Sequence, residues 1–300
     1  MQGMVIYYIR FKNSSYIYRE MNEMITCSKM NGNGNDFLII NNMDLKYDTS
    51  TLIGLTKKIC RRRESIGADG LLVVEPSNVH AFKMRLINRD GVEGEMCGNG
   101  ARCMARYAYE KKIIDDKKMT FETLGGDVEA EVNGNRVILK LAEVDLDNAV
   151  VDKMDQVGDF NFSYTYMVVG VPHVVIFESI RRSDDEYRKY GRLIRNRLDL
   201  FPEGANVNFV VAREDKKDTL DVVTYERGVE DLTLSCGTGS TASAIASVLI
   251  GLTGPNVDVF NPGGLNKVSI KFESSNKIVP KLEGGALLVA DLTLTEEALA

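Results

Sequence analysis

Hydrophobic residues along the chain form short runs bounded by turn residues, interspersed with segments of helical spacing. In the first half, the runs TCSKM, DFLII, GLLVV and KMRLI predict strands. Between them, TSTLIGLTKKIC and ARCMARYAYEKKII have helical spacing, and the basic end of the first segment suits a helix C-terminus. MTFETLGGDVEAEVNGNRVILKLAE then predicts further strands, with a hairpin turn at Asn133-Gly134.

The second half repeats this order of elements. YMVVGVPHVVIFES predicts a strand pair, and ANVNFVVAR and DTLDVVTYERG predict two more strands. DDEYRKYGRLIRNRL and STASAIASVLIGLTG predict helices, and KVSIKFES to ADLTL predicts the closing strands. The pattern as a whole indicates a mixed α/β (α+β) fold.

Four landmarks recur with a nearly constant offset of about 138 residues, far longer than a solenoid repeat. The matching pairs are Gly34 and Gly170, Gly67 and Gly204, Cys97 and Cys236, and Gly125 and Gly263. We interpret this as a duplication that produced two related domains. The predicted division is 24–143, together with the C-terminal tail at about 283–300, and 146–280, with the chain crossing near residues 143–146.

Residues 1–23 are not part of either repeat. Their aromatic and aliphatic residues alternate, which would suit an extra strand, but Arg10, Lys12 and Arg19 make a poor signal peptide. The segment could equally be an extension before a natural start at Met21 or Met24. Both interpretations stay open at this point.

Composition narrows the function. The net charge of −6 and scattered basic residues give no electrostatic footprint for nucleic acid. No apolar run approaches the roughly 20 residues of a membrane span. Five cysteines without disulfide-framework spacing favour free thiols in a reducing compartment, here the cytoplasm. With two histidines in the chain, we predict no metal site.

Two cysteines lie in matching surroundings. NRDGVEGEMCGNGARC places Cys97, and YERGVEDLTLSCGTGS places Cys236, between a charged turn and a predicted helix. Neither glycine-rich stretch matches a dinucleotide or phosphate-loop fingerprint. The other three cysteines, Cys27, Cys60 and Cys103, fit packed core positions better than reactive ones.

A thiol at a helix N-terminus feels a positive potential, which lowers its pKa from about 8.5. The unpaired N–H groups there can also hold a carboxylate, and glycine lets the backbone approach closely. If the two domains face each other, one thiolate can remove the α-proton of a bound carboxylate and the opposite thiol can return one, inverting the centre. Such chemistry needs neither a metal nor a pyridoxal cofactor.

The chain resembles the diaminopimelate epimerase family from about residue 24 to its end. The resemblance rests on KMNGNGNDF, SIGADGLLVVEP, NRDGVEGEMCGNGARC, GVPHVVIF, FPEGANVNF and YERGVEDLTLSCGTGS. It implies interconversion of the LL and meso forms of diaminopimelate, in lysine and peptidoglycan precursor synthesis, without a cofactor. It further implies two domains about a pseudo-twofold axis, each a barrel-like sheet around a central helix, in a homodimer.

The resemblance also implies roles for individual residues. Cys97 and Cys236 match the two acid/base residues, and His173 and Glu226 match groups that orient the reacting end. Substrate-binding positions match at Asn35, Asn88, Gly98, Asn99, Asn206, Glu226, Arg227, Gly237 and Thr238. Arg227 would pair with the distant carboxylate. The residues alone leave simpler readings open, in which Asn35 and Asn88 shape turns and Glu226 and Arg227 form a surface ion pair.

Two motifs depart from the family pattern. Val171 stands where the family usually has the asparagine of Gly-Asn-Pro-His, and Asn31-Gly32-Asn33-Gly34 replaces His-Gly-Leu-Gly. Neither change touches the cysteines, so a racemase or epimerase of another amino acid, such as histidine or lanthionine, stays open. A proton-shifting isomerase would have lost one cysteine, and a non-catalytic amino-acid-binding protein would not need the second.

Overall fold

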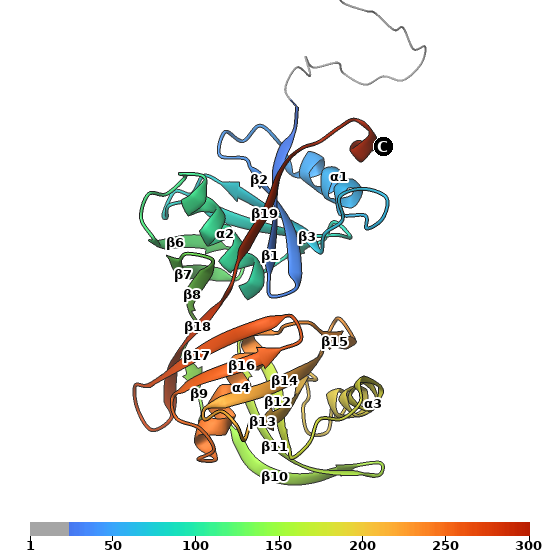
Figure 1. Ribbon diagram of the computed structural model, residues 1–300, viewed down its shortest axis with the longest axis vertical. Helices are drawn as coiled ribbons and strands as arrows, with labels where there is room; N and C mark the ends of the chain where they lie inside the picture. Colours follow the sequence, from blue (N-terminus) through green and yellow to red (C-terminus); the bar gives the residue numbers. More distant parts are fainter. Residues whose placement is uncertain (1–23) are drawn as a thin grey trace, which may run out of the picture.

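The computed structural model describes residues 24–300. Residues 1–23, whose two interpretations are given above, lie outside the described residues. The described chain forms two halves, one above the other in Figure 1, and the C-terminal strands run from the lower half to the upper one.

Each half contains two α-helices, and strands make up most of the rest. The first half contains β1 Thr26–Gly32, β2 Asn35–Asn41, α1 Thr49–Ile59, β3 Gly70–Glu75, β4 Lys83–Asn88, β5 Glu93–Gly94, α2 Gly98–Glu110, β6 Lys118–Thr123, β7 Gly126–Asn133, β8 Arg136–Lys140 and β9 Val144–Asp145. The remainder contains β10 Val150–Val157, β11 Phe160–Val169, β12 Val171–Glu178, α3 Asp184–Arg195, β13 Asn206–Ala212, β14 Thr219–Glu226, β15 Asp231–Thr233, α4 Gly237–Leu249, β16 Asn256–Asn261, β17 Gly264–Phe272, β18 Lys277–Gly285, β19 Leu287–Thr293 and the 3-10 helix η1 Glu297–Leu299.

The strand pairing of the first half is repeated in the second. In the first half β1 pairs with β2, β2 runs parallel to β3, β3 pairs antiparallel with β4, and β4 runs parallel to β6. In the second half β11, β12, β13, β14 and β16 follow the same sequence of parallel and antiparallel pairs. The predicted duplication is therefore present in the fold.

Each half closes its sheet with strands from near the end of the other repeat. The first sheet continues through β7 and β8 to β18, and β19 pairs back onto β1. The second continues through β16 and β17 to β18, which also pairs with β9, and β10 pairs with β11. The C-terminal segment thus lies against the first half, while the domain boundaries at residues 143 and 146 stay a prediction.

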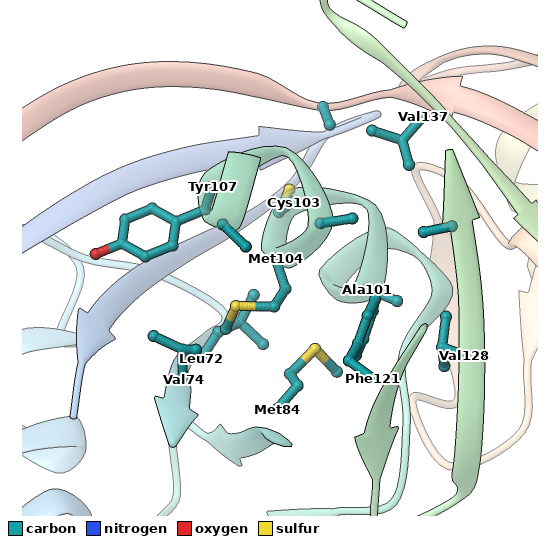
Figure 2. Packing of buried hydrophobic residues seen from close by; sticks show 14 of the residues in the cluster. Leu72, Val74, Met84, Ala101, Cys103, Met104, Tyr107, Phe121, Val128 and Val137 are labelled. Atoms are coloured by element: carbon teal, nitrogen blue, oxygen red, sulfur yellow. The ribbon is translucent and has the colours of Figure 1, made fainter. Parts of the chain in front are cut away.

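Helices α2 and α4 lie inside the two closed sheets, as expected for a barrel-like sheet around a central helix. Figure 2 shows side chains of α2, among them Ala101 and Met104, surrounded by Met84 from β4 and Phe121 from β6. In the second half, the small residues of α4 let the sheet approach closely, and Ala242, Ala244 and Ala246 are fully buried. Such burial holds each helix, and therefore its N-terminus, in a fixed place.

Helices α1 and α3 cover the outside of the sheets. Asp48 caps α1 by accepting from the N–H of Thr51, and Ser183 and Glu186 form a capping box at α3. The buried faces of α1 and α3 form two further hydrophobic clusters with the strands. By contrast, the residues preceding α2 and α4 are cysteines.

The sequence-based prediction omits strands β10 and β16. Most side chains of β10 are exposed, so its sequence lacks the alternation that marks a strand with one buried face. Strand β16 does alternate, with Val257 and Val259 buried, so its pattern was sufficient to predict it. The prediction for Cys27, Cys60 and Cys103 is confirmed, because all three are buried among hydrophobic side chains.

Candidate active site

In the first half, three strand ends meet at one edge of the sheet. Because β2 and β3 run parallel and β4 runs antiparallel to β3, the starts of β2 and β3 lie beside the end of β4. This places Asn35, the first residue of β2, near Asn88, the last residue of β4. Asn88 lies opposite Gly70, and Asp69 directly precedes that glycine.

The second half uses the same geometry for a different set of side chains. The starts of β12 and β13 lie beside the end of β14, and His173 is paired in register with Asn206. Glu226 is the last residue of β14. Arg227 follows it, and its backbone N–H donates to the Asn206 side-chain oxygen at 2.8 Å. The matched topology explains why residues far apart in the sequence converge.

Cys97 directly precedes α2 and has an extended backbone, with φ −132° and ψ 121°. Its carbonyl accepts the helix hydrogen bond from Ala101 at 2.7 Å. Burial raises the pKa of the Cys97 thiol, while the N–H groups of Gly100 and Asn99 and the charge of Arg102 act in the opposite direction. The thiol therefore faces the unpaired N–H donors of a helix N-terminus.

Cys236 occupies the equivalent position before α4. Its sulfur accepts from the N–H of Gly239 at 3.3 Å and lies 3.5 Å from the hydroxyl oxygen of Thr238. Burial, reinforced by the charge of Glu226, raises the pKa of the Cys236 thiol to about 12. The first helical residues, Gly237 and Thr238, present N–H groups that have no partner within the helix.

The two helix N-termini are joined by side chains. The Asn99 amide donates to the carbonyl of Ser235, the residue before Cys236, at 3.2 Å. The Arg102 guanidinium, with 0% exposure, donates in turn to the Asn99 side-chain oxygen at 2.6 Å. Each thiol also lies within the electrostatic influence of Glu226, whose charge raises the pKa of both. The structure thus brings Cys97 and Cys236 into one site.

His173 is fully buried, and burial, followed by the charge of Arg227, lowers its pKa to about 3. Its Nδ1 atom lies 3.2 Å from the side-chain nitrogen of Asn208, which also donates to the carbonyl of Val174. Because the Asn208 oxygen accepts from Thr224, the amide nitrogen must face the ring, so Nδ1 is an acceptor. Nε2 then carries the proton, and it has no partner among the described residues.

Glu226 and Arg227 do not form the ion pair that the sequence leaves open. Burial raises the pKa of the Glu226 carboxyl. The Arg227 guanidinium instead donates to the carbonyl of Glu203 at 2.6 Å. Both side chains are half-buried at the end of β14, so neither behaves as a solvated surface charge.

A model of the diaminopimelate epimerase family matches residues 27–150 and 165–287. The chain belongs to the diaminopimelate epimerase family. A diaminopimelate epimerase of Caldanaerobacter subterraneus subsp. tengcongensis is 38% identical over 263 residues, covering 83% of this chain and 93% of the relative. One of Carboxydothermus hydrogenoformans is 40% identical over 249 residues, covering 79% of this chain and 88% of the relative.

Solved structures share the fold of this epimerase-family chain at low sequence identity. A PhzF-family phenazine biosynthesis protein of Bacillus anthracis matches with a TM-score of 0.70 and 15% identity, covering 91% of this chain and 99% of that one. A hydroxyproline epimerase of Agrobacterium vitis matches with a TM-score of 0.64 and 13% identity, covering 90% of this chain and 91% of that one.

Sequence reasoning missed four residues of this epimerase-family site. Asp69, Arg102, Asn208 and Ser235 contact the predicted residues, but none was singled out. For Asp69 the signal was its place in GADG, directly before a strand. Arg102 is fully buried on α2, and nothing in the sequence indicates this burial. Within residues 24–300, no three His, Cys, Asp or Glu side chains are grouped to hold a metal ion.

Proposed function

We propose that this chain is a diaminopimelate epimerase that inverts the α-carbon of LL-diaminopimelate to give the meso form. Cys97 and Cys236 act as the two acid/base residues. The observation that carries the proposal is the joining of two helix N-termini, each preceded by a cysteine, through Asn99 and Ser235. Membership of the diaminopimelate epimerase family supports diaminopimelate as the substrate.

The reacting carboxylate would bind between the two helix N-termini. The N–H groups of Gly98 and Asn99 on α2, and of Gly237 and Thr238 on α4, lie in the first turns, where they have no partner within the helix and can donate to its oxygens. These donors stabilise the negative charge that develops on the carboxylate when the α-proton leaves. At the first position of α2, a Cβ added at Gly98 would meet no atom within 4 Å, so the space in front of this helix is open to the ligand.

Inversion requires one proton carrier on each face of the α-carbon. One cysteine, as the thiolate, takes the α-proton, and the electron pair of the broken C–H bond moves into the carboxylate. The other cysteine, as the thiol, then returns a proton from the opposite face and is left as the thiolate. A thiolate shielded from water is a stronger base, and burial raises the pKa of both thiols.

His173 and Glu226 would orient the reacting end without exchanging protons with the α-carbon. With its pKa lowered to about 3, His173 is neutral at physiological pH, and its free Nε2–H can donate to the substrate. The Glu226 carboxylate would pair with the substrate α-ammonium group. Its placement near both thiols supports this role, because the α-nitrogen is bonded to the carbon between them.

The distant amino-carboxylate end would bind to Asn35, Asn88, Asn206 and Arg227. Only one of the five N–H donors of a guanidinium is used when Arg227 donates to Glu203, so a bidentate pair with a carboxylate is open to it. Asn206 is held by the backbone of Arg227, which keeps the two side chains together. Asn35 and Asn88 come from the facing half.

A second candidate, a racemase or epimerase of histidine or lanthionine, is favoured by one observation. Val171 is the first residue of β12, and the adjacent Gly170 has φ 70° and lies near the Thr238 side chain. The family's usual asparagine would supply polar atoms there, and valine supplies none. The substitution therefore lies beside α4 and removes a contact that would select the substrate.

Hydrogen exchange at the α-carbon tests the proposal. LL-diaminopimelate, meso-diaminopimelate, lanthionine and histidine would each be incubated with the protein in deuterated water and followed by proton NMR. Loss of the α-proton signal from diaminopimelate with formation of the other isomer is the expected result. Exchange with histidine or lanthionine alone would favour the second candidate, and exchange with none of the four would refute two-base catalysis on these substrates.

The proposal includes a homodimer in the reducing cytoplasm. All five cysteines are free, as a reducing compartment favours. Leu287 and Val289 are exposed on the same face of β19, where a second copy could cover them. None of the helices in residues 24–300 is long and apolar enough to cross a membrane. Light scattering coupled to size-exclusion chromatography would measure the mass, and a monomer at micromolar concentration would contradict the dimer.

A further inference from the structure

The side-chain amide of Asn35 lies between a candidate acid/base residue and a carboxylate. Its oxygen lies 3.5 Å from the Cys97 sulfur, and its nitrogen donates to the Asp69 carboxylate at 2.6 Å. Asn35 opens β2, and Asp69 directly precedes β3, which runs parallel to it. The contact therefore depends on the strand pairing that brings these two ends together.

The orientation of this amide follows from the chemistry of its partners. An ionised carboxylate accepts hydrogen bonds and donates none, so the amide nitrogen of Asn35 must face Asp69. Its oxygen must then face Cys97, because an amide presents the two groups on opposite sides. An oxygen at this place accepts from a thiol and repels a thiolate.

Asp69 is itself held firmly. One carboxylate oxygen accepts from the Arg62 guanidinium at 2.9 Å, and the other accepts from the backbone N–H of Asp36 at 3.1 Å as well as from Asn35. The backbone N–H of Asp69 donates to the carbonyl of Asp36 at 2.9 Å, which fixes the loop against β2. Asp69 therefore cannot turn away from Asn35 without losing several contacts.

The second half of the molecule lacks this arrangement. Val171 opens β12 as Asn35 opens β2, and it has no side-chain polar atom to offer Cys236. The Cys236 sulfur instead accepts from the N–H of Gly239. Both thiols face N–H groups of the helix that follows them, but only Cys97 also has a side-chain amide oxygen beside it.

We propose that Asp69 is a positioning residue that locks the Asn35 amide with its oxygen toward Cys97, and so holds Cys97 as the thiol before substrate binds. This inference rests on the proposed function and extends it, since it distinguishes two cysteines that the inversion mechanism treats alike. Release of the amide would let Asn35 turn its nitrogen toward the sulfur and stabilise the thiolate.

Other groups also act on the protonation of Cys97. The N–H groups of Asn99 and Gly100 and the Arg102 guanidinium, all on α2, favour the thiolate. From the second half, Glu226 on β14 disfavours it, and the charge of Cys97 in turn raises the pKa of the Cys236 thiol before α4. None of these groups changes when Asp69 or Asn35 is replaced. A shift in the apparent pKa of Cys97 in such variants therefore reports on the Asn35 amide or on the charge of Asp69.

The pH dependence of alkylation by iodoacetamide tests the inference, with each cysteine followed separately by mass spectrometry of its peptide. In Asp69→Ala, the apparent pKa for alkylation of Cys97 should fall by about one unit, as expected when a charged group gains a hydrogen bond. The profile of Cys236 in the same protein serves as the internal control and should stay unchanged. An unchanged Cys97 profile in a folded variant overturns the inference.

A double-mutant cycle separates positioning from the charge of Asp69. Asn35→Leu removes the amide while keeping its approximate size, and Asp69→Ala in that background should shift the Cys97 profile by less than about a third of its effect in wild type. An equal shift in both backgrounds would mean that Asp69 acts through its charge, and would overturn the inference. If Asp69→Ala fails to fold by circular dichroism, Asp69→Asn takes its place in the same cycle.

Alkylation needs no substrate, so its outcome is independent of the proposed function. A Cys97 shift without α-proton exchange on diaminopimelate would support the positioning role and refute the activity. Exchange without the shift would support the activity and refute the role of Asp69. If both the Cys97 shift and the exchange are observed, the acidic limb of the pH profile of kcat/KM should move in Asp69→Ala by as much as the apparent pKa of Cys97. A merely structural defect would not produce this shift.

Discussion

The Asn99 side chain donates a hydrogen bond to the main-chain carbonyl of Ser235 at 3.2 Å, and so ties the N-terminus of α2 to the residue before Cys236. Its oxygen accepts from the buried guanidinium of Arg102 at 2.6 Å. Arg102 also donates to the carbonyl of Gly285, at the end of β18, at 3.3 Å. One buried chain of hydrogen bonds therefore fixes the spacing of the two thiols.

Asn99→Ala should lower the free energy of unfolding by about 2–3 kcal/mol, because it removes one of the two hydrogen-bond acceptors of the buried Arg102 guanidinium. Arg102→Met removes that charge, so Asn99→Ala should cost clearly less in the Arg102→Met background. Urea unfolding of the wild type, both single variants and the double variant measures the coupling. Equal costs of Asn99→Ala in both backgrounds would contradict the coupled network.

Cys97→Ala and Cys236→Ala should each lower the rate of inversion by roughly 10²- to 10⁴-fold or more, since each face of the α-carbon needs its own proton carrier. Steady-state assays on diaminopimelate measure this. Cys103→Ala is the matched control, because Cys103 is fully buried in the core cluster. It should retain activity and lose about 1 kcal/mol of stability. Substantial inversion by the Cys97→Ala protein would rule out the two-base mechanism.

Replacing a glycine at the start of α2 or α4 by alanine should affect stability at one position and substrate binding at the other. A Cβ at Gly239 would clash with the Asn208 side-chain oxygen, which accepts from Thr224, so Gly239→Ala should lower stability by about 1–3 kcal/mol. A Cβ at Gly98 would meet no atom within 4 Å, so Gly98→Ala should fold normally and raise KM by filling the carboxylate site. Thermal unfolding and kinetics of both proteins would check this, and an equally destabilised Gly98→Ala would contradict it.

The burial of His173 should make stability depend on pH. Its pKa is lowered from 6.5 to about 3, so below pH 6.5 the unfolded chain binds a proton that the folded protein does not. Stability should therefore be complete above pH 6.5 and fall as the pH drops toward 3, by up to about 1.4 kcal/mol per unit.

The difference in unfolding free energy between wild type and His173→Gln isolates this contribution. It should stay constant from pH 8 to 6.5, and from there to pH 5 the wild type should lose about 2 kcal/mol relative to the variant. Cys103→Ala, which removes no group that titrates in this range, should show a constant difference throughout. A constant difference for His173→Gln would show that the histidine binds its proton equally well in the folded and unfolded protein, and would contradict the lowered pKa.

How far the sequence predicts this site depends on whether a residue acts locally or through the pairing of strands. The helix that follows each cysteine is a local feature, and the repeated spacing around Cys97 and Cys236 was enough to predict it. The return of β19 to β1 was anticipated from the tail, but β10 was not, because an exposed strand carries little hydrophobic alternation.

Contacts between the halves could not be predicted in the same way. Arg102 lies on a helix face that sequence spacing alone would leave exposed, yet it is fully buried because β18 crosses from the second half and covers it. Asp69 belongs to a turn motif, and its contact with Asn35 requires the parallel register of β2 and β3. Both residues act through tertiary contacts that one sequence does not encode locally.

Val171→Asn should tighten the binding of diaminopimelate, or leave it unchanged, because it restores a donor and an acceptor beside α4. A regained hydrogen bond to a charged group is worth about 1.5–3 kcal/mol, which corresponds to roughly ten- to a hundredfold in affinity. The favoured substrate is still diaminopimelate, since Asn88, Glu226 and Arg227 are retained. Steady-state kinetics of both proteins on diaminopimelate, lanthionine and histidine would measure the effect.

Val168→Asn makes the same change at a position of β11 that is 47% exposed, and it should leave all three KM values unchanged. A lower KM for diaminopimelate in Val171→Asn alone would assign specificity to that position. If the wild type turns over histidine and ignores diaminopimelate, the two-thiol mechanism stands and the assigned substrate is wrong. In that case Val171→Asn should weaken histidine turnover, because a polar side chain would replace the apolar wall that a monocarboxylate with a neutral ring would contact.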